Sequence, residues 1–419
     1  MRRSGAWMVA VMLTAAVLLP SAALATNGYF SHGVGMKSKG MGGVGVALPV
    51  DALSAGVNPA SSIHLGDRFD VGLDWFRPDR GSEISGSGAP VNAVYDANDT
   101  EYFFVPEVGM TKSLNDRVAF GLAVYGNGGM NTSYTTPVGL FGSTNAGVDL
   151  SQLFIVPSVA VRVSDGHALG LGVNVAWQRF KADGLENFDD ASYTSTPGKV
   201  TGNDYDSSTG FGVTVGWIGR VGCAVTMGAT YRSRTFMGEF EDYAGLFAEE
   251  GTFDIPSSFS AGIAVTPDSR STVAVDVSYI MYSDVNSIAN PLLPNLGEAQ
   301  LGTEDGAGFG WEDVTVVKIG AEYDLTDAFT ARVGYNYGGQ PIPESETLFN
   351  ILAPGVVEQH VTLGGTWRLN ESMELTFAYM HAFEKTVEGE ESIPMDFGGG
   401  EADLTMSQDT FGVSFGMVY

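Results

Sequence analysis

The sequence has very little cysteine, few basic residues and no long apolar run after its first 25 residues. Cys223 is the single cysteine, so no disulfide and no site with two thiolate ligands can form within the chain. Lys and Arg together number 21 against 49 Asp and Glu, and this acidic balance excludes nucleic acid as a partner. The lack of a run of 18 apolar residues excludes a bundle of membrane-spanning helices.

The first 25 residues have the pattern of a cleaved signal peptide. Arg2 and Arg3 supply positive charge, residues 6–19 are an apolar stretch, and residues 23–25 form a small-x-small cleavage site. A membrane anchor is the alternative, although this stretch is short for a span of about 20 residues. Cleavage would leave a net charge of 19 − 49 = −30 on the chain that begins at Thr26.

From residue 69 to Tyr419 the chain repeats a stretch of alternating apolar and polar residues followed by a turn. In the last stretch the odd-numbered residues 411–419 are apolar or aromatic, with Gly412 and Ser414 between them. Short turns and long loops alternate, which predicts an all-β fold, a transmembrane antiparallel β-barrel of about 14 strands in a bacterial outer membrane. The predicted strands span 69–78, 101–113, 116–134, 150–163, 167–182, 207–219, 222–239, 251–266, 271–287, 311–324, 328–341, 357–369, 373–387 and 402–419. A soluble β-sandwich would also alternate, but it would need neither a signal peptide nor this order of connections.

Residues 26–68 differ from this barrel region, because they are rich in Gly, Ala and Ser and lack strand alternation. Small residues suit close packing in a confined space, so we predict a plug, or hatch, inside the barrel lumen; a periplasmic extension is the alternative. The spacing Gly40-x-Gly42-x-x-Gly45 matches a dinucleotide-binding fingerprint. No strand precedes it, so glycine-assisted packing is the better interpretation.

No arrangement of residues points to catalysis or to a metal site. The five histidines are scattered, and none pairs with Cys, Asp or Glu at the spacing of metal ligands. We therefore predict that the chain is not an enzyme and needs no cofactor or metal. Acidic residues gather in the predicted loops, where a solvated loop and a divalent-cation site both remain open interpretations.

The third predicted strand contains three glycines in the segment Gly126-Asn127-Gly128-Gly129. Glycines weaken a strand and mark a bulge or bend. In a barrel wall an inward bend would open a gap toward lipid, and such a gap is tolerated only where it lines a protected cavity. A structural bulge with no further role is the alternative.

Apolar residues also occur in loops that should lie outside the cell. Tyr243, Leu246 and Phe247 have helical spacing in one loop, and further apolar clusters lie in residues 292–296 and 348–352. Exposed apolar clusters indicate a binding surface or loops that pack on one another, and both can hold together.

Together these residues resemble the FadL/TodX family of outer-membrane transporters for hydrophobic compounds. The resemblance rests on the triplet Asn58-Pro59-Ala60, the segment Lys37-Ser38-x-Gly40-Met41-Gly42-Gly43, the glycine-interrupted third strand, the strand count and the C-terminal aromatic residue. It implies a monomeric barrel with an N-terminal hatch, an extracellular apolar groove, an inner pocket and a kinked third strand. Residues 58–60 would belong to the hatch, residues 126–129 to the kink, and the loops at 183–206 and 240–250 to the capture groove.

The resemblance therefore implies uptake of hydrophobic compounds, with long-chain fatty acids as the expected cargo, by capture in the loops, hatch movement and lateral exit at the kink. Alternatives are a passive porin for polar solutes, a channel for aromatic hydrocarbons, and a structural or adhesive surface barrel. A fatty-acid carboxylate would need a lumenal cation, and strand phase offers Lys318 and Arg332, unless these pair with Asp276 and Glu322. The expected surroundings are outer-membrane lipid and lipopolysaccharide, reached through the barrel-assembly machinery.

Overall fold

The computed structural model describes residues 27–419, so the predicted signal peptide lies outside the described residues. None of the helices within this range combines the length and the apolar character that crossing a bilayer requires. The strands are β1 (Arg68–Ser85), β2 (Ala93–Asp96), β3 (Phe103–Asn115), β4 (Val118–Ser133), β5 (Gly147–Ser164), β6 (His167–Asp183), β7 (Asp206–Val221), β8 (Val225–Arg232), β9 (Phe236–Met237), β10 (Ser257–Val265), β11 (Ser271–Met281), β12 (Val314–Thr326), β13 (Phe329–Gly338), β14 (Gln359–Arg368), β15 (Met373–Val387) and β16 (Glu401–Val418).

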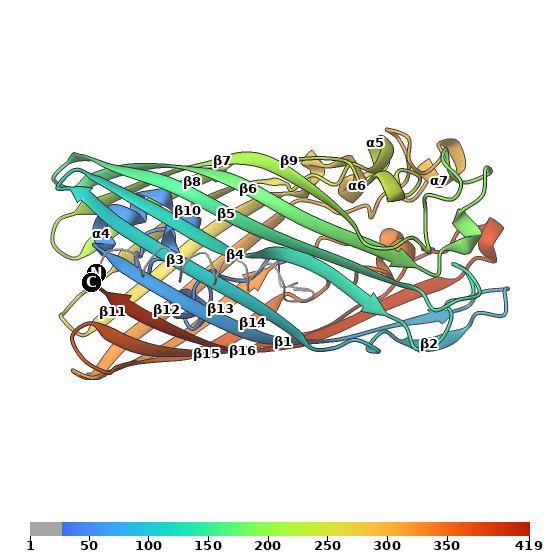
Figure 1. The fold of residues 1–419 in the computed structure, drawn as a ribbon. Coiled ribbons are helices and arrows are strands. Elements are labelled where there is room, and N and C mark those ends of the chain that lie inside the picture. The colour runs from blue at the N-terminus through green and yellow to red at the C-terminus, as the bar shows by residue number, and fades with distance from the viewer. Residues whose placement is uncertain (1–26) are drawn as a thin grey trace.

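These strands form one antiparallel sheet that closes on itself (Figure 1). The closing pair is β1 with β16, which runs from Arg68 opposite Val418 to Ser85 opposite Glu401. Two short strands are side branches, since β2 pairs only with β1 and β9 only with β7. The wall therefore has 16 − 2 = 14 strands, and the predicted fourteen-stranded barrel is confirmed.

The two ends of the barrel differ in their connections. Short turns and the C-terminus lie at one end, and the long loops with α5, α6 and α7 lie at the other (Figure 1). The short helices are α2 (Met36–Lys39), α3 (Ser54–Val57), η1 (Pro59–Ser61), α4 (Ser62–Leu65), η2 (Glu186–Phe188), η3 (Glu241–Tyr243), α5 (Ala248–Gly251), η4 (Tyr282–Asp284), α6 (Asn286–Ala289), α7 (Asn295–Glu298), η5 (Glu344–Glu346), α8 (Thr347–Asn350) and η6 (Met395–Phe397).

Apolar side chains cover the outer surface of the wall, as the alternation predicts. On β11, Val273, Val277 and Tyr279 are exposed while Asp276 between them is buried toward the lumen. Aromatic residues also align across neighbouring strands: Trp75 lies opposite both Phe104 and Phe411, and Phe411 lies opposite Tyr379. All four rings are exposed, and such a row is typical of the membrane interface around a barrel.

The first strand is longer than the predicted range 69–78, because Pro78 does not end it. On one side of β1, β3 pairs with Arg68 to Phe76 and β2 pairs with Gly81 to Ile84. Residues 77–80 have no strand on that side, so a proline without an N–H group is tolerated there. The predicted strand over 222–239 is too long, since β8 ends at Arg232.

Residues 27–67, called the hatch segment below, lie inside the wall (Figure 1). Helix α2 packs against β14 and β15, and η1 packs against β6 and β7. Met36, Met41 and Leu53 are fully buried. The segment is built mainly from small residues because the lumen leaves little space beside the inward side chains of the wall.

Candidate functional site

Asn58 joins the hatch segment to the wall through three hydrogen bonds. Its Nδ2 atom donates to the carbonyl oxygens of Val46, at 2.7 Å, and Trp217 on β7, at 3.0 Å. Its Oδ1 atom accepts from the Ala60 amide at 3.1 Å, which caps η1, and Pro59 occupies the first position of that helix, where an N–H group is not needed. The predicted triplet thus lies against the inner wall.

Charged side chains of the wall also bind the hatch segment. Lys39 forms buried ion pairs with Asp74 on β1 and with Glu107 on β3, where the Nζ–Oε2 distance is 2.9 Å. Asp276 on β11 accepts hydrogen bonds from the amides of Gly45, at 2.7 Å, and Val46, at 3.0 Å. Buried charges require such partners, so these wall residues hold the segment in a defined position.

The wall is interrupted at β4, at the predicted glycines. Opposite β5, Gly126 faces Leu153 and Gly128 faces Gln152, so Asn127 is an extra residue and forms a bulge. On the other side, pairing of β3 with β4 stops at Val108 opposite Val124. Residues 103–107 of β3 therefore have no partner on β4, and this window in the ladder is what we call the wall gap.

The start of the hatch segment satisfies the backbone of the displaced strand. The amide of Ser31 donates to the carbonyl oxygen of Asn127, and the amide of Gly129 donates to that of Tyr29, each at 3.1 Å. Gly128 is required at this contact, because a Cβ atom there would collide with the Tyr29 carbonyl. On the β3 side, Pro106 faces the interruption, which again places a proline beside a missing partner.

The long loops enclose an apolar pocket of about 30 Å³ next to a larger buried cluster. Of the residues predicted for capture, Leu246 and Phe247 line this pocket. Tyr243 lies behind them, its ring 4.8 Å from that of Phe180, and its hydroxyl donates to the Asn203 carbonyl at 2.8 Å. Leu246 and Phe247 therefore line the pocket, and Tyr243 supports them from behind.

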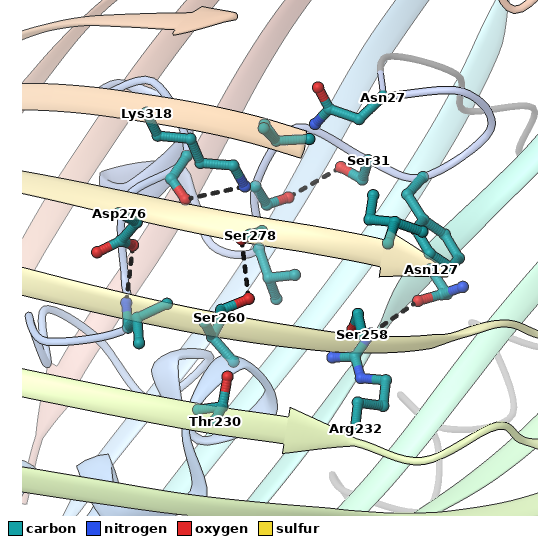
Figure 2. A pocket seen from close by; sticks show the side chains of 18 of the residues that line it. Asn27, Ser31, Asn127, Thr230, Arg232, Ser258, Ser260, Asp276, Ser278 and Lys318 are labelled. Carbon is teal, nitrogen blue, oxygen red and sulfur yellow. Dashed lines mark hydrogen bonds between the residues drawn. The ribbon is translucent and has the colours of Figure 1, made fainter. Parts of the chain in front are cut away.

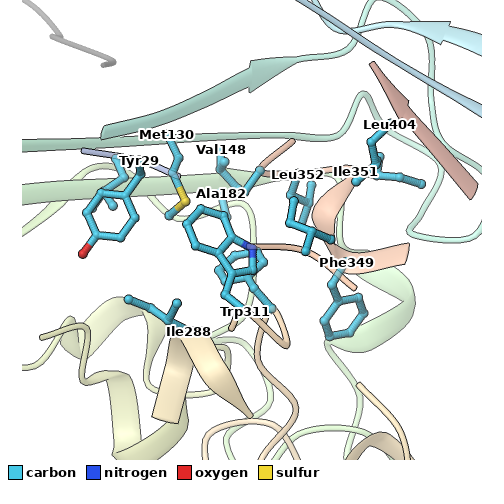
Figure 3. Packing of buried hydrophobic residues seen from close by; sticks show 14 of the residues in the cluster. Tyr29, Met130, Val148, Ala182, Ile288, Trp311, Phe349, Ile351, Leu352 and Leu404 are labelled. Atoms are coloured by element: carbon cyan, nitrogen blue, oxygen red, sulfur yellow. The ribbon is translucent and has the colours of Figure 1, made fainter. Parts of the chain in front are cut away.

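A series of aromatic rings connects this pocket with the wall gap. Phe309 lines the pocket, its ring is 6.3 Å from Trp311, and Trp311 is 6.0 Å from Tyr29. Figure 3 shows Trp311 between Tyr29 and Phe349. Because the Tyr29 backbone binds the displaced part of β4, the series leads from the loops to the gap. Trp311 lies outside the predicted set, since its position depends on how the loops fold over the lumen.

A second cavity, of about 110 Å³, lies between the hatch segment and the wall (Figure 2). Hydroxyl groups from the wall line it, together with Lys318, Arg232 and Asn127. Lys318 donates to the hatch carbonyls of His32, at 2.9 Å, and Gly43, at 3.5 Å. This cavity, called the polar cavity below, is lined by polar as well as apolar side chains, in contrast to the pocket in the loops.

The two predicted cations have different surroundings. Lys318 lines the polar cavity, whereas Arg332 binds Glu322 at 3.0 Å and Thr366 at 2.5 Å and is not part of that lining. Sequence reasoning missed Arg232, which donates to Asn127 Oδ1 at 3.2 Å and to the carbonyl of Gly56 at 3.1 Å. Strand phase could have found it, because it shares the lumenal face of β8 with Gly228 and Thr230. Among residues 27–419, no group of three or more His, Cys, Asp or Glu side chains could hold a metal ion.

Comparisons with known proteins agree with this architecture. A family model described as outer membrane protein transport protein (OMPP1/FadL/TodX) matches residues 12–419. The long-chain fatty acid transport protein of Escherichia coli O157:H7 is 23% identical over 409 residues, covering 86% of this chain and 88% of the relative. The K12 protein of the same name is 23% identical over 412 residues, with the same coverage.

Solved structures share the fold. A Pseudomonas aeruginosa FadL homologue superimposes with a TM-score of 0.70 at 17% identity, covering 93% of this chain and 99% of the homologue. The Pseudomonas putida toluene transporter TodX gives a TM-score of 0.68 at 18% identity, with the same coverage.

Proposed function

This chain belongs to the OMPP1/FadL/TodX family of outer membrane transport proteins, and on that premise we propose that it takes up hydrophobic compounds by capture in the loop pocket and sideways release into the membrane. The observation that carries the proposal is the wall gap, where β3 loses β4 as a partner beyond Val108. An interruption facing lipid is costly unless it lines a protected path. The aromatic series ends beside this gap, so it supports such a path.

The energetics favour sideways exit over release into water. Burying a methylene stabilises a bound hydrocarbon chain by about 0.8 kcal/mol, so capture from water is easy and release into water is slow. Lipid tails offer a similarly apolar environment. A cargo that leaves through the gap therefore avoids the aqueous periplasm.

The hatch segment has to move for cargo to pass. It fills the lumen, and its first residues, Tyr29 and Ser31, bind the displaced strand directly. Cargo bound near Trp311 would contact Tyr29, and it can shift the hatch only by binding two arrangements unequally. The polar cavity beside the segment provides room for such a shift.

The remaining expectations about cellular context are part of the proposal. They are a signal peptide cleaved after Ala25, insertion by the barrel-assembly machinery, lipopolysaccharide around the loops and a monomeric state. A single chain closes the wall, which supports the monomer.

Deleting Asn127 tests the exit route, because it removes the extra residue of the bulge and lets β4 pair regularly. We expect uptake of labelled toluene and decan-1-ol by cells producing the deletion variant to fall to background, with the barrel still folded. Asn127→Ala is the matched control: it keeps the residue count and should keep uptake within about threefold of wild type.

Wild-type uptake by the folded deletion variant would overturn the lateral route. Ion conductance of the wild-type protein in planar bilayers would instead favour a passive porin. If the deletion variant loses uptake because its barrel does not fold, Gly128→Val takes its place in the test. This variant keeps the residue count but blocks the contact with Tyr29.

A further inference from the structure

We infer that the cargo of the loop pocket is an uncharged hydrophobic molecule, a hydrocarbon or an alcohol, and not a carboxylate. This inference rests on the proposed function and specifies the substrate class of the same pocket. It is carried by the pocket lining, by the partners of the cations in the loops and the lumen, and by the charge of the loops as a whole.

Within residues 27–419, no charged side chain lines the loop pocket. Fourteen residues line it, and six of them are phenylalanines: Phe141, Phe180, Phe188, Phe247, Phe309 and Phe349. Ser287 is the single lining residue with a hydroxyl group, and it already donates to the Thr252 carbonyl at 2.6 Å. A carboxylate that entered would lose its hydration without gaining a partner, which strongly disfavours binding.

The charged groups close to the pocket are themselves carboxylates or are already paired. Glu346 is buried behind the lining and accepts from the Leu292 amide at 2.7 Å. The two basic residues of the long loops both form ion pairs, Lys199 with Asp242 at 2.5 Å and Arg234 with Asp254 at 2.6 Å. A fatty acid would have to displace one of these carboxylates to obtain a cation.

The lumenal cations already have partners as well. Arg80, which lines a small cavity with Trp311 and Tyr29, donates to the carbonyl oxygens of Asn131 and Thr100, each at 2.6 Å. Lys39 and Arg332 are ion-paired with wall carboxylates. Lys318 donates to two hatch carbonyls, and Arg232 to the hatch and to Asn127. None of these cations is among the residues that line the loop pocket.

The long connections form a strongly acidic entrance. They carry 26 Asp and Glu residues but only Lys199 and Arg234 as basic ones, a net charge of 2 − 26 = −24. The connections counted are residues 86–102, 134–146, 184–205, 233–256, 282–313, 339–358 and 388–400. A field of this sign lowers the local concentration of anions and leaves neutral molecules unaffected.

Decan-1-ol and decanoate test the inference, because they share a ten-carbon tail and differ in charge. The pocket of about 30 Å³ has to widen equally to admit either tail, so its size does not affect the comparison. Equilibrium dialysis of the full protein in amphipol, with each labelled compound at pH 8, measures both dissociation constants against a protein-free blank. We expect decan-1-ol to bind at least about tenfold more tightly. Leu246→Lys adds a cation to the pocket lining and should reduce this preference about tenfold. Gly297→Lys adds the same charge at an exposed loop site outside the lining and should leave the preference unchanged.

The outcomes separate this inference from the proposed function. Binding of decanoate by the wild-type protein within about threefold of decan-1-ol would overturn the inference and leave the proposed uptake function intact. An unchanged preference in a folded Leu246→Lys variant would also overturn it, because the charge of the pocket lining would then not determine the preference. Binding of neither compound would overturn both.

Discussion

At the scale of single residues, the hatch segment is held by buried polar atoms whose partners are on the wall. Asn58 is fully buried and uses both its donor and its acceptor groups. Losing one partner of a buried hydrogen bond leaves the other unsatisfied, at about 1–3 kcal/mol. Such residues therefore help to hold the docked segment in one position.

Asn58→Ala should loosen the hatch segment while the barrel stays folded. The variant leaves the carbonyls of Val46 and Trp217 without this donor, and we expect docking to weaken by about 1–3 kcal/mol. Hydrogen exchange of residues 46–61 would measure the change as faster exchange. Asn187→Ala, at an exposed loop site, is the control and should leave exchange in this segment unchanged. Equal exchange in both variants would contradict the role assigned to Asn58.

The pH dependence of hatch docking should follow Asp51. Burial, and next the neighbouring carboxylate of Asp70, raise the pKa of Asp51 to about 7. The free side chain has a pKa of about 3.9, so the docked state holds its proton to higher pH. Docking is therefore most stable at acidic pH and weakens as the pH rises through about 7.

Thermal unfolding at pH 5 and pH 8 would measure this effect. The wild-type protein should unfold at a lower temperature at pH 8, and Asp51→Asn should reduce the difference between the two pH values. The same pH difference in the Asn variant would assign the effect to another group.

At the scale of elements, periodicity predicted the wall well because each strand contacts lipid on one face and the lumen on the other. It failed at Pro78, where the missing neighbour that permits a proline is a property of the tertiary fold. The glycines of β4 predicted the bulge, but the pairing of that bulge with Tyr29 and Ser31 left no periodic signal. Strand phase placed Lys318 in the lumen, yet its hatch partners depend on the irregular path of the segment.

Gly128→Ala should detach the start of the hatch segment from β4. The added methyl group would collide with the Tyr29 carbonyl, so the pairing of Tyr29 with Gly129 should open. Limited proteolysis near residues 27–34 would then be faster by at least about fivefold. Gly339→Ala provides the control, because a Cβ atom there meets no other atom within 4 Å. Equal cleavage of the two variants would show that the glycine is not needed for this contact.

At the scale of the whole molecule, the chain separates its charges into layers. The outer wall is apolar, the lumen contains paired charges that hold the hatch segment, and the acidic excess lies in the long loops. Charged residues in the lumen thus position the hatch segment, whereas those at the entrance select the cargo. Selection by a field acts on the rate of entry, so salt distinguishes it from selection by the pocket lining.

Raising the salt concentration should therefore speed the capture of decanoate and leave that of decan-1-ol unchanged. Between about 20 and 500 mM NaCl the screening length falls several-fold, so we expect the association rate of decanoate to rise by at least about threefold. Stopped-flow measurement of ligand-dependent tryptophan fluorescence would follow this rate, because Trp311 lies between the pocket and the gap. Glu304→Gln combined with Asp305→Asn removes two exposed charges from one loop and should reduce the salt effect. The control, Glu304→Asp combined with Asp305→Glu, keeps both charges and should preserve the salt effect. A salt effect of equal size on both ligands would show that the loop charges do not select between them.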